Sequence, residues 1–464
     1  MQIDELQSEF IKLQHDIRTG PIYPNVTASE IRSHLEKYYS FSSPLNLDDL
    51  IADVTEMLRT WNVQITHPRY LGLFNPSVTL AAVAADVLVA MHNPQLASWR
   101  TSPAANEIER YTLAWLAEKF GLPVNTHASF TNGGAEANLS AVIAALTRAF
   151  PAYGEDGLRS LTRTPTIYLS SQAHHSFTKI AHMTGIGRNS IRIVATDRSL
   201  KMDLTDLDRQ IAEDRRNGFS PLMIVGTCGT TSAGVIDPLT ELGRRCARSG
   251  LWFHVDAAWG GAAVLSPTLR QHLAGIELAD SVTCDAHKWF SVPMGCGMFF
   301  CRHPKVIAAA FHADANYMPS QMDDTPDPYT HSMQWSRRFT GLKLFMSLAH
   351  HGASGYAEIL ERQARMADVL RSSLLEAGWN VLNSTPLPLV CFTRDELDID
   401  VFLSSVRDHQ VAWMSEVKIA GMSAVRACIT SYHTTELDIA TVVEQLNQLV
   451  PSCLHGATSF GSVS

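Results

Sequence analysis

The sequence predicts an α/β protein with a large, mainly parallel sheet and a smaller α+β domain at its C-terminal end. Three observations predict this class. Strand-like and helix-like patterns alternate from about residue 76 to residue 335, which is typical of a parallel sheet covered by helices on both faces. The pattern then changes to one long helical stretch followed by short strands. Finally, 464 residues with 45% hydrophobic side chains are too many for one compact core and suggest more than one domain.

The first part of the chain, residues 1–75, is expected to form an N-terminal arm and not an independent domain. Its helical patterns are interrupted by Pro21, Pro24 and Pro44, and they begin at polar capping residues such as Ser29. Proline ends a helix because it lacks the N–H group and its ring collides with the preceding turn. We therefore expect short helices here.

The large domain is expected within residues 76–341. Its predicted strands lie at 166–169, 191–195, 222–227, 251–255, 281–284 and 297–301, and helical patterns at 204–216 and 239–249 lie between some of them. Ligands of such sheets bind beyond the carboxyl ends of the strands. The functional site is therefore expected at that edge of the sheet.

The smaller domain is expected within residues 342–464. A long helix at 342–377 precedes strands near 379–382, 389–392, 411–416 and 425–429, and a last helix runs from about 435 to 449. Helices and strands that are grouped in this way predict an α+β arrangement.

Charge and composition exclude several kinds of partner. The net charge is −9 and no basic stripe with interleaved aromatic residues is present, which argues against nucleic acid. The longest apolar stretch, at 78–91, is interrupted by Asp86 and is too short to span a bilayer, so we expect no membrane insertion.

The N-terminus and the cysteines favour a cytoplasmic location. The chain starts without a basic head followed by an apolar segment, so no secretory signal is visible. Its eight cysteines are scattered without a CxxC pair. Reduced and mostly buried thiols are the expected state of such cysteines in a cytosolic enzyme.

Two short stretches predict the chemistry of the site. Lys288 follows His287 at the end of one strand-like run, and Asp256 ends another. A lysine that forms a Schiff base and an aspartate that pairs with a pyridinium nitrogen are what pyridoxal phosphate (PLP) requires of a protein. A surface lysine and an aspartate that caps a helix are the alternatives for these residues. Because both lie at the carboxyl ends of predicted strands, we favour the cofactor site.

A glycine pair supports a phosphate site. Gly133 and Gly134 precede a strong helical pattern at 139–150. Glycines let the backbone approach a ligand closely, and the free amides at a helix start hold a phosphate. Alone, such a pair is more often only a turn; in order with the aspartate and the lysine it becomes a strong signal.

Three further polar residues are weaker candidates. His174 could stack on the cofactor ring and meet a substrate carboxylate, whereas His175 is better explained as a polar loop residue. Thr231 follows a strand and offers a hydroxyl, although most Gly-Thr turns are structural. Histidines can also bind a metal ion, but no HxxxH motif or cysteine–histidine cluster supports this, so no metal site is expected.

Several ordered motifs together resemble group II PLP-dependent amino-acid decarboxylases, a family that includes aromatic-L-amino-acid, glutamate, cysteine-sulfinate and 2,4-diaminobutyrate decarboxylases. The likeness covers most of the chain. It is carried by His67-Pro68-Arg69-Tyr70, the glycine loop, His174, His254-Val255-Asp256-Ala257-Ala258, Asp285-Ala286-His287-Lys288-Trp289, Trp335-Ser336-Arg337-Arg338-Phe339 and Val425-Arg426-Ala427-Cys428-Ile429-Thr430.

The resemblance implies the aspartate-aminotransferase-type fold, known as fold type I, and a homodimer whose active sites are shared at the interface, with the N-terminal arm as a dimerisation segment. Lys288 would carry the cofactor and Asp256 would pair with its pyridinium. The resemblance places other residues around the cofactor: Ala258 and His174 on the ring, and Gly134, Ala135, Asp285, Ser77, Thr231 and His287 at or near the phosphate. Many relatives have asparagine where this chain has Asp285.

The resemblance also implies residues that act on the substrate. Tyr317 matches a tyrosine of a mobile loop that donates the proton completing decarboxylation, and the polar, proline-containing stretch at 319–330 is typical of a lid. Relatives with phenylalanine at that tyrosine form aldehydes oxidatively, so Tyr317 favours simple decarboxylation, with His174 and His287 as further catalytic candidates. The implied substrate-binding residues are Phe74, Asn75, Gln95, Ala97, Arg100 and Arg337.

The sequence therefore predicts a carboxy-lyase that converts an L-amino acid into an amine and CO2. Phe74 slightly favours an aromatic substrate, Arg100 would pair with an acidic one or lie in a surface ion pair, and 2,4-diaminobutyrate ranks below both. An aldehyde synthase or aminotransferase on the same fold stays open as an alternative reaction. A catalytically inactive PLP-fold binding protein is a third hypothesis, against which Lys288 and Asp256 speak.

Overall fold

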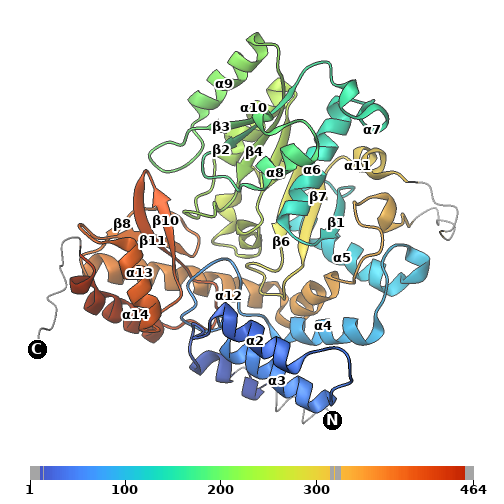
Figure 1. Cartoon of the computed structure of the whole chain (residues 1–464). Helices are drawn as coiled ribbons and strands as arrows, with labels where there is room; N and C mark the ends of the chain where they lie inside the picture. The colour runs from blue at the N-terminus through green and yellow to red at the C-terminus, as the bar shows by residue number, and fades with distance from the viewer. Residues whose placement is uncertain (1–10, 14, 314–317, 319–324, 455–464) are drawn as a thin grey trace, which may run out of the picture.

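A seven-stranded sheet forms the centre of the molecule in the computed structural model, which describes residues 11–13, 15–313, 318 and 325–454 (Figure 1). The strand order is β1-β7-β6-β5-β4-β2-β3. The strands are β1 (His127–Thr131), β2 (Pro165–Ser170), β3 (Ile191–Val194), β4 (Ser220–Thr227), β5 (Trp252–Asp256), β6 (Ser281–Asp285) and β7 (Gly297–Cys301).

The sheet is mainly parallel, as the sequence predicts. β3, β2, β4, β5 and β6 pair in parallel, and β7 runs antiparallel to its neighbours β6 and β1. The sequence patterns miss β1, because this strand is short, half-buried over its first residues and interrupted by polar side chains.

Helices cover both faces of the sheet. α6 (Gly134–Ala149), α8 (Ser176–Met183) and α11 (Pro304–Phe311) pack on one face, and α5 (Pro103–Lys119), α9 (Leu204–Arg216) and α10 (Leu239–Ser249) pack on the other. Side chains alternate between these two cores along each strand, because a strand points successive residues to opposite faces. In β4, Met223 and Val225 join the core under α6, and Ile224 joins the other.

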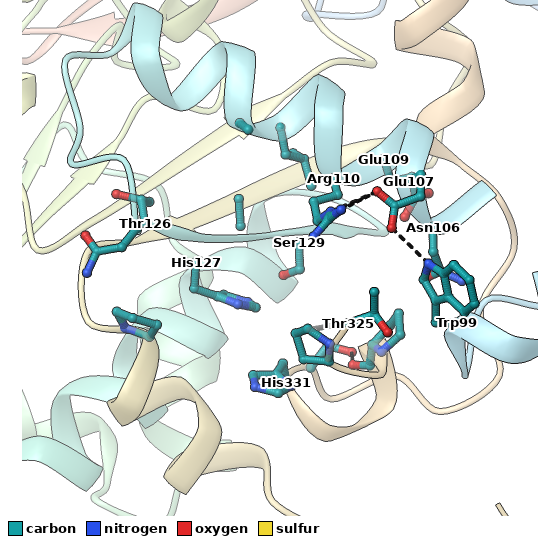
Figure 2. Close-up of a pocket in the computed structure, with 18 of the residues that line it drawn as sticks. Trp99, Asn106, Glu107, Glu109, Arg110, Thr126, His127, Ser129, Thr325 and His331 are labelled. Atoms are coloured by element: carbon teal, nitrogen blue, oxygen red, sulfur yellow. Dashed lines mark hydrogen bonds and ion pairs between the residues drawn. The ribbon is translucent and has the colours of Figure 1, made fainter. Parts of the chain in front are cut away.

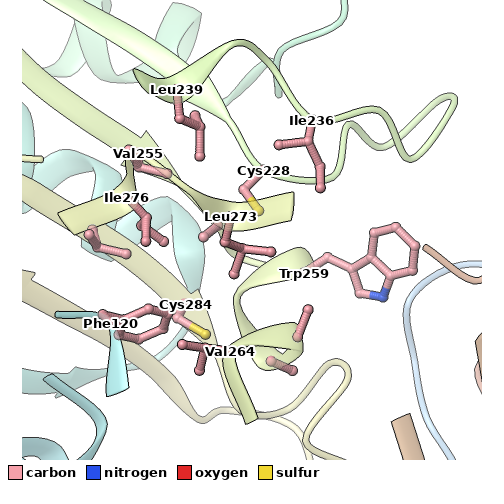
Figure 3. Packing of buried hydrophobic residues seen from close by; sticks show 14 of the residues in the cluster. Phe120, Cys228, Ile236, Leu239, Val255, Trp259, Val264, Leu273, Ile276 and Cys284 are labelled. Atoms are coloured by element: carbon pink, nitrogen blue, oxygen red, sulfur yellow. The ribbon is translucent and has the colours of Figure 1, made fainter. Parts of the chain in front are cut away.

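The hydrophobic core beneath α10 extends to the carboxyl ends of β4 and β5. Figure 3 shows Leu239 of α10 and Val255 of β5 among the side chains of this cluster, together with Cys228 and Trp259. All eight cysteines are buried and free, as predicted for reduced thiols.

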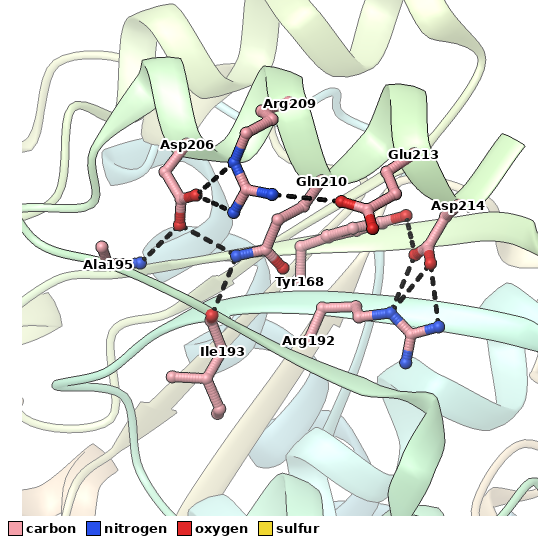
Figure 4. Close-up of polar contacts among 9 residues, drawn as sticks. All are labelled: Tyr168, Arg192, Ile193, Ala195, Asp206, Arg209, Gln210, Glu213 and Asp214. Atoms are coloured by element: carbon pink, nitrogen blue, oxygen red, sulfur yellow. Dashed lines mark hydrogen bonds and ion pairs between the residues drawn. The ribbon is translucent and has the colours of Figure 1, made fainter. Parts of the chain in front are cut away.

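A polar network fastens α9 to the edge of the sheet (Figure 4). The buried carboxylate of Asp214 accepts hydrogen bonds from the Tyr168 hydroxyl at 2.5 Å and from Arg192 Nε at 2.9 Å. Burial raises the pKa of Tyr168, so this hydroxyl keeps its proton and remains the donor. The network lies between α9, β2 and β3.

The C-terminal part contains a second, antiparallel sheet in the order β10-β11-β9-β8 (Figure 1). Its elements are α12 (Gly341–Glu376), β8 (Asn380–Val381), β9 (Leu389–Thr393), α13 (Ile399–Asp408), β10 (Ser415–Ile419), β11 (Met422–Cys428) and α14 (Glu436–Leu449). These match the predicted α+β order.

Two predictions for this region need correction. The long helix is interrupted at Gly352, whose φ of 66° and ψ of 174° are not helical, so α12 is two helical pieces joined at a kink. The strand predicted at 411–416 instead begins at Ser415. The backbone of Trp413 just before it is already engaged, because its N–H donates to Arg69 O and its carbonyl accepts from Leu71 N.

The N-terminal part contributes α2 (Ala28–Tyr38), α3 (Leu47–Thr60) and α4 (Leu80–His92). α4 packs against α12 (Figure 1). α2 and α3 bury none of their side chains. Within the described residues, no helix has both the length and the apolar composition that crossing a bilayer requires.

Candidate active site

The carboxyl ends of β5 and β6 bring the predicted lysine and aspartate to one edge of the sheet. Asp256 is the last residue of β5, and β6 pairs beside it in parallel, with Asp256 opposite Thr283. Lys288 lies in the turn after β6, where its N–H donates to Asp285 O. Its Nζ is 3.0 Å from Asp285 Oδ2, and its side chain is 23% exposed.

The start of α6 faces the same edge. A Cβ at Gly134 would lie 3.0 Å from Asp285 Oδ2 and 3.2 Å from Ala258 Cβ, so only glycine lets the helix start come this close. In this part of the structure no side chain caps α6. The first-turn N–H groups, including those of Gly134 and Ala135, have no acceptor within the helix and are suited to hold an anion.

Asp256 is buried and held by two donors. Its Oδ1 accepts from the N–H of Ala258 at 3.1 Å, and its Oδ2 accepts from Asn138 Nδ2 at 3.0 Å. Both contacts stabilise the ionised carboxylate and fix its orientation. Asn138 belongs to the glycine loop motif, but the sequence gives it no role.

His174 lies close to the charges of this site. Desolvation lowers the pKa of His174; the Asp256 carboxylate opposes this shift and Lys288 adds to it. The ring is therefore neutral at neutral pH. Because its Nδ1 accepts the N–H of Ser176 at 3.2 Å, Nε2 carries the proton and can donate it.

His287 lies beside both Asp285 and the helix start, since a Cβ at Gly133 would be 3.2 Å from His287 Cε1. Desolvation also lowers the pKa of His287, and Asp285 opposes that shift. Its Nδ1 accepts the N–H of Cys296 at 3.1 Å, so the proton of the neutral ring lies on Nε2, 3.7 Å from Asp285 Oδ2.

Asp285 keeps one oxygen without a partner. Oδ2 pairs with Lys288, whereas Oδ1 is buried and accepts no hydrogen bond from any described residue. A Cβ at Gly297 would lie 2.8 Å from this Oδ1 and 2.6 Å from Gly133 Cα, so the surroundings are tightly packed. A buried and unsatisfied oxygen costs about 1–3 kcal/mol of folding free energy.

Arg426 is a charged residue of the site to which the sequence assigned no role. It lies in β11 and is almost fully buried; Nε donates to Thr231 O at 2.7 Å and Nη1 to Gly72 O at 2.6 Å. Its Nη2 finds no acceptor among the described residues. A single arginine within an apolar strand pattern was the signal that could have revealed it, since a buried charge needs a partner.

Phe74 joins this arginine to the lysine. The Arg426 guanidinium lies 4.9 Å from the centre of the Phe74 ring, and Lys288 Nζ lies 5.7 Å from it. Phe74 also stacks on Trp259, with 4.3 Å between the ring centres. The site therefore combines an aromatic wall with two cations.

The structure places the remaining predicted residues as follows. Ser77 is buried and bonds to Ser431 Oγ at 2.8 Å, and Asn75 Nδ2 donates to Met294 Sδ. Gln95 donates to Ser336, the carbonyl of Ala97 accepts from the N–H of Tyr329, and Arg100 is exposed in the short helix η1 (Trp99–Thr101). Thus Gln95 and Ala97 contact the 329–336 segment of their own chain.

Arg337, which is predicted to contact the substrate, lines a cavity that is separate from Lys288, Asp256 and His174. The cavity has a volume of about 380 Å³ and is lined by His127, His331 and residues of α5 (Figure 2). Arg337 Nη1 lies 2.6 Å from Glu109 Oε2, and both side chains are buried. The partner of Arg337 in this chain is therefore an acid of α5, and none of Lys288, Asp256 or His174 lines the cavity.

Tyr317 and the first half of the predicted lid at 319–330, residues 319–324, lie outside the described residues. The end of this stretch is described and forms the short helix η7 (Pro328–Thr330). In the parts of the chain that the structure covers, no group of three or more His, Cys, Asp or Glu side chains could hold a metal ion.

The fold and this geometry define a class of protein: a PLP-dependent enzyme of fold type I. A lysine and an aspartate at neighbouring strand ends, facing an uncapped helix start, are the arrangement that the cofactor's aldehyde, ring nitrogen and phosphate require. The comparisons with known proteins agree.

The chain belongs to the family described as "Pyridoxal-dependent decarboxylase conserved domain", whose model matches residues 32–394. PLP is its cofactor, and its reaction class is that of a carboxy-lyase. The group II decarboxylase resemblance is thereby confirmed.

The known proteins to which this chain is similar have several different activities. The chain is 28% identical to 4-hydroxyphenylacetaldehyde synthase of Rhodiola rosea, over 90% of this chain and 88% of that protein. It is also 28% identical to tyrosine decarboxylase 2 of Arabidopsis thaliana, over 94% and 83%. The crystal structure of Catharanthus roseus tryptophan decarboxylase with L-tryptophan superposes with a TM-score of 0.88 at 24% identity, covering 97% of this chain and 99% of that chain.

Proposed function

We propose that this enzyme decarboxylates an aromatic L-amino acid at the site formed by Lys288, Asp256, His174 and Arg426. The observation that carries the proposal is the convergence of Lys288 and Arg426 on the two-ring wall of Phe74 and Trp259. An aromatic wall favours an apolar, planar side chain. The fixed cation favours the carboxylate that every amino acid carries.

The residues present fit PLP. The uncapped start of α6 would hold the phosphate with the N–H groups of Gly134 and Ala135, and Asp256 would pair with the ring nitrogen. Ala258 and His174 would lie on the two sides of the ring. When bound, PLP supplies the conjugated system that accepts the electron pair of the breaking bond.

The chain's own side chains orient the substrate and move the proton. Arg426 Nη2 would bind the α-carboxylate of the incoming amino acid. An ion pair with the carboxylate stabilises the bound substrate at least as much as it stabilises the transition state. It therefore does not lower the activation barrier, and the contribution of the arginine is to orient the substrate. His174 holds a proton on Nε2 and is one candidate donor to Cα; Tyr317 and His287 are the others.

We also propose that the enzyme is a cytoplasmic homodimer with shared active sites and α3 in its interface. Leu47, Ile51, Val54 and Leu58 form one stripe along α3 and are 66%, 55%, 37% and 56% exposed. The spacing of four, three and four residues puts them on one helix face. The partner that fits is a second copy of this chain. The resemblance assigns Gln95 and Ala97 to a substrate pocket, but in their own chain both contact the 329–336 segment. In a dimer with shared active sites they would line the pocket of the other copy.

An oxidative aldehyde synthase is the second candidate, favoured by the similarity to the Rhodiola rosea enzyme. Decarboxylases of acidic amino acids or of 2,4-diaminobutyrate are further candidates, the latter supported by the relative from Acinetobacter baumannii at 28% identity. The products separate these reactions, since simple decarboxylation yields an amine, whereas the oxidative route yields an aldehyde, ammonia and peroxide.

The test is a panel of aromatic, acidic, sulfinic and basic L-amino acids, assayed with added PLP for CO2, amine, ammonia and peroxide. We expect CO2 and amine in equal amounts from an aromatic substrate. Lys288→Ala should abolish both, whereas Lys305→Ala, at an exposed lysine of α11, should leave them unchanged. Turnover of acidic or basic substrates alone would contradict the aromatic proposal, and peroxide in place of amine would favour the synthase.

A further inference from the structure

A chain of buried hydrogen bonds begins at Asp256 and runs through Asn138 of α6 to side chains of β5 and β6. Asn138 Nδ2 donates to Asp256 Oδ2 at 3.0 Å. Asn138 Oδ1 lies 2.7 Å from Thr283 Oγ1 and 3.0 Å from His254 Nε2. Further back, His254 Nδ1 lies 2.8 Å from Ser281 Oγ, which accepts from Trp252 Nε1 at 2.8 Å.

All members of this chain are buried. His254 and Thr283 are completely inaccessible to solvent, and Asn138, Ser281 and Trp252 are 1–3% exposed. Water therefore does not compete for these groups, so their hydrogens are directed to one another or to Ser176 Oγ, which accepts from Asn138 Nδ2 at 3.3 Å.

The donors can be assigned from the two ends. The indole N–H of Trp252 can only donate, so Ser281 Oγ accepts it. At the other end Asn138 Oδ1 can only accept, so His254 presents Nε2–H to it and Nδ1 is left to accept from the Ser281 hydroxyl. His254 is neutral, since burial lowers its pKa to about 4, so its proton lies on Nε2 and is donated to Asn138 Oδ1. The Asn138 amide then presents its NH2 group to Asp256.

The opposite arrangement is incompatible with a charged Asp256. Turning the Asn138 amide around would place Oδ1 against a carboxylate oxygen, and it would place the NH2 group against the donors of Thr283 and His254. Protonating Asp256 so that it could donate to Asn138 would require reversing the amide and the histidine tautomer together. The buried hydrogen bonds thus hold the Asn138 amide with its NH2 group toward Asp256, which is the orientation that suits a carboxylate acceptor.

We propose that Asn138, held by Thr283 and His254, is a positioning residue that keeps Asp256 ionised and aimed at the pyridine nitrogen of PLP. This inference deepens the proposed function, because an ionised Asp256 is what keeps the ring nitrogen protonated and able to attract electrons. It does not depend on which amino acid is the substrate.

The test compares near-isosteric variants by readouts other than turnover. Thr283→Val removes the donor to Asn138 and keeps the shape, whereas Thr283→Ser keeps the donor. Asn138→Leu removes the whole contact with Asp256. PLP labelled with ¹⁵N at the ring is bound to each protein, and its nitrogen chemical shift reports protonation; the PLP dissociation constant is measured alongside.

We expect wild-type and Thr283→Ser to hold a protonated nitrogen at neutral pH. Thr283→Val and Asn138→Leu should shift the nitrogen signal toward the unprotonated form and weaken PLP binding about tenfold, as loss of outer partners does at metal sites. The control is Tyr168→Phe, which removes a buried hydroxyl bonded to Asp214 at the far edge of the sheet (Figure 4). It should unfold more easily with an unchanged nitrogen signal.

Wild-type nitrogen signals and PLP affinities in both Thr283→Val and Asn138→Leu would overturn the inference. So would a Thr283→Ser protein that behaves like Thr283→Val, because then the hydroxyl is not the active group. If Asn138→Leu does not fold, the threonine pair alone decides. A wild-type protein that binds no PLP would instead contradict the function itself, so the two failures are distinguishable.

Discussion

At the scale of single residues, charges from distant parts of the chain meet around one small volume. Asp256 and Asp285 come from neighbouring strand ends, Lys288 from the turn after β6, and Arg426 from the C-terminal sheet. Asp256 has its donors, Lys288 pairs with Asp285, and Arg426 and Asp285 each keep one atom without a described partner. The unsatisfied atoms are where ligands are expected to act.

Replacing Arg426 tests the carboxylate contact. Arg426→Met should raise KM for the amino acid about 10- to 100-fold, because a charge-assisted hydrogen bond contributes about 1.5–3 kcal/mol. PLP binding should change little. The measurement is steady-state kinetics with a binding titration of the cofactor. Arg394→Met is the matched control, since that guanidinium also lies over a ring, that of Trp379, next to the ends of β9 and β8. An unchanged KM would contradict the proposed contact.

Replacing Asp285 tests its place beside the phosphate. Asp285→Asn keeps the shape of the side chain and removes a negative charge next to the PLP phosphate. It also allows an amide NH2 group to replace Oδ1, the oxygen without a described partner. The PLP dissociation constant should therefore fall several-fold. Equilibrium titration of the apoprotein with PLP measures this. Asp280→Asn, just before the opposite end of β6, should cost stability through its lost contacts with Arg148 and His303 and leave PLP affinity unchanged. Weaker binding in Asp285→Asn would refute the expectation.

At the scale of elements, the sequence predicted the strongly amphipathic helices more accurately than the short strands and the kinks. α9 and α10 begin and end at the predicted residues, because amphipathic spacing and a clear stop define them. β1 and the break of α12 at Gly352 were not predicted, since a short polar strand and a single kink leave the local pattern almost unchanged. The division of the chain after residues 75 and 341 stays a prediction.

The exposed stripe of α3 makes the proposed dimer testable. The double variant Ile51→Glu with Leu58→Glu should convert the dimer to monomers, because two charges would have to be buried in an apolar interface. Sedimentation equilibrium measures the mass. Ala52→Glu, on another face of the same helix and also exposed, should leave the mass unchanged. A dimeric double variant would exclude this stripe from the interface.

At the scale of the whole molecule, buried neutral histidines make stability depend on pH. Burial lowers the pKa of His254 and of His67 from the ordinary 6.5 to about 4, and Arg69 adds to the shift of His67 whereas Asp438 opposes it. Between these values the unfolded chain binds protons that the folded chain does not. The stabilisation is therefore complete above pH 6.5 and is lost as the pH falls toward 4.

We expect the free energy of unfolding of the apoprotein to fall by about 1.4 kcal/mol per pH unit for each such histidine in this window. Denaturant titrations between about pH 7 and about pH 5 measure the slope. His67→Asn should make the slope smaller by the share of one histidine. An identical slope in wild-type and His67→Asn proteins would show that His67 is not the titrating group.

The sequence by itself determined the α/β class, the order of the glycine loop, aspartate and lysine, and with them the cofactor, because these signals are local and each is complete within a few residues. Only the tertiary structure decided that Arg426 meets Phe74, that Arg337 pairs with Glu109, and that Asn138 connects Asp256 to His254 and Thr283. Such contacts join residues far apart in the chain, and they arise from how strands and helices pack, which no local pattern of side chains records.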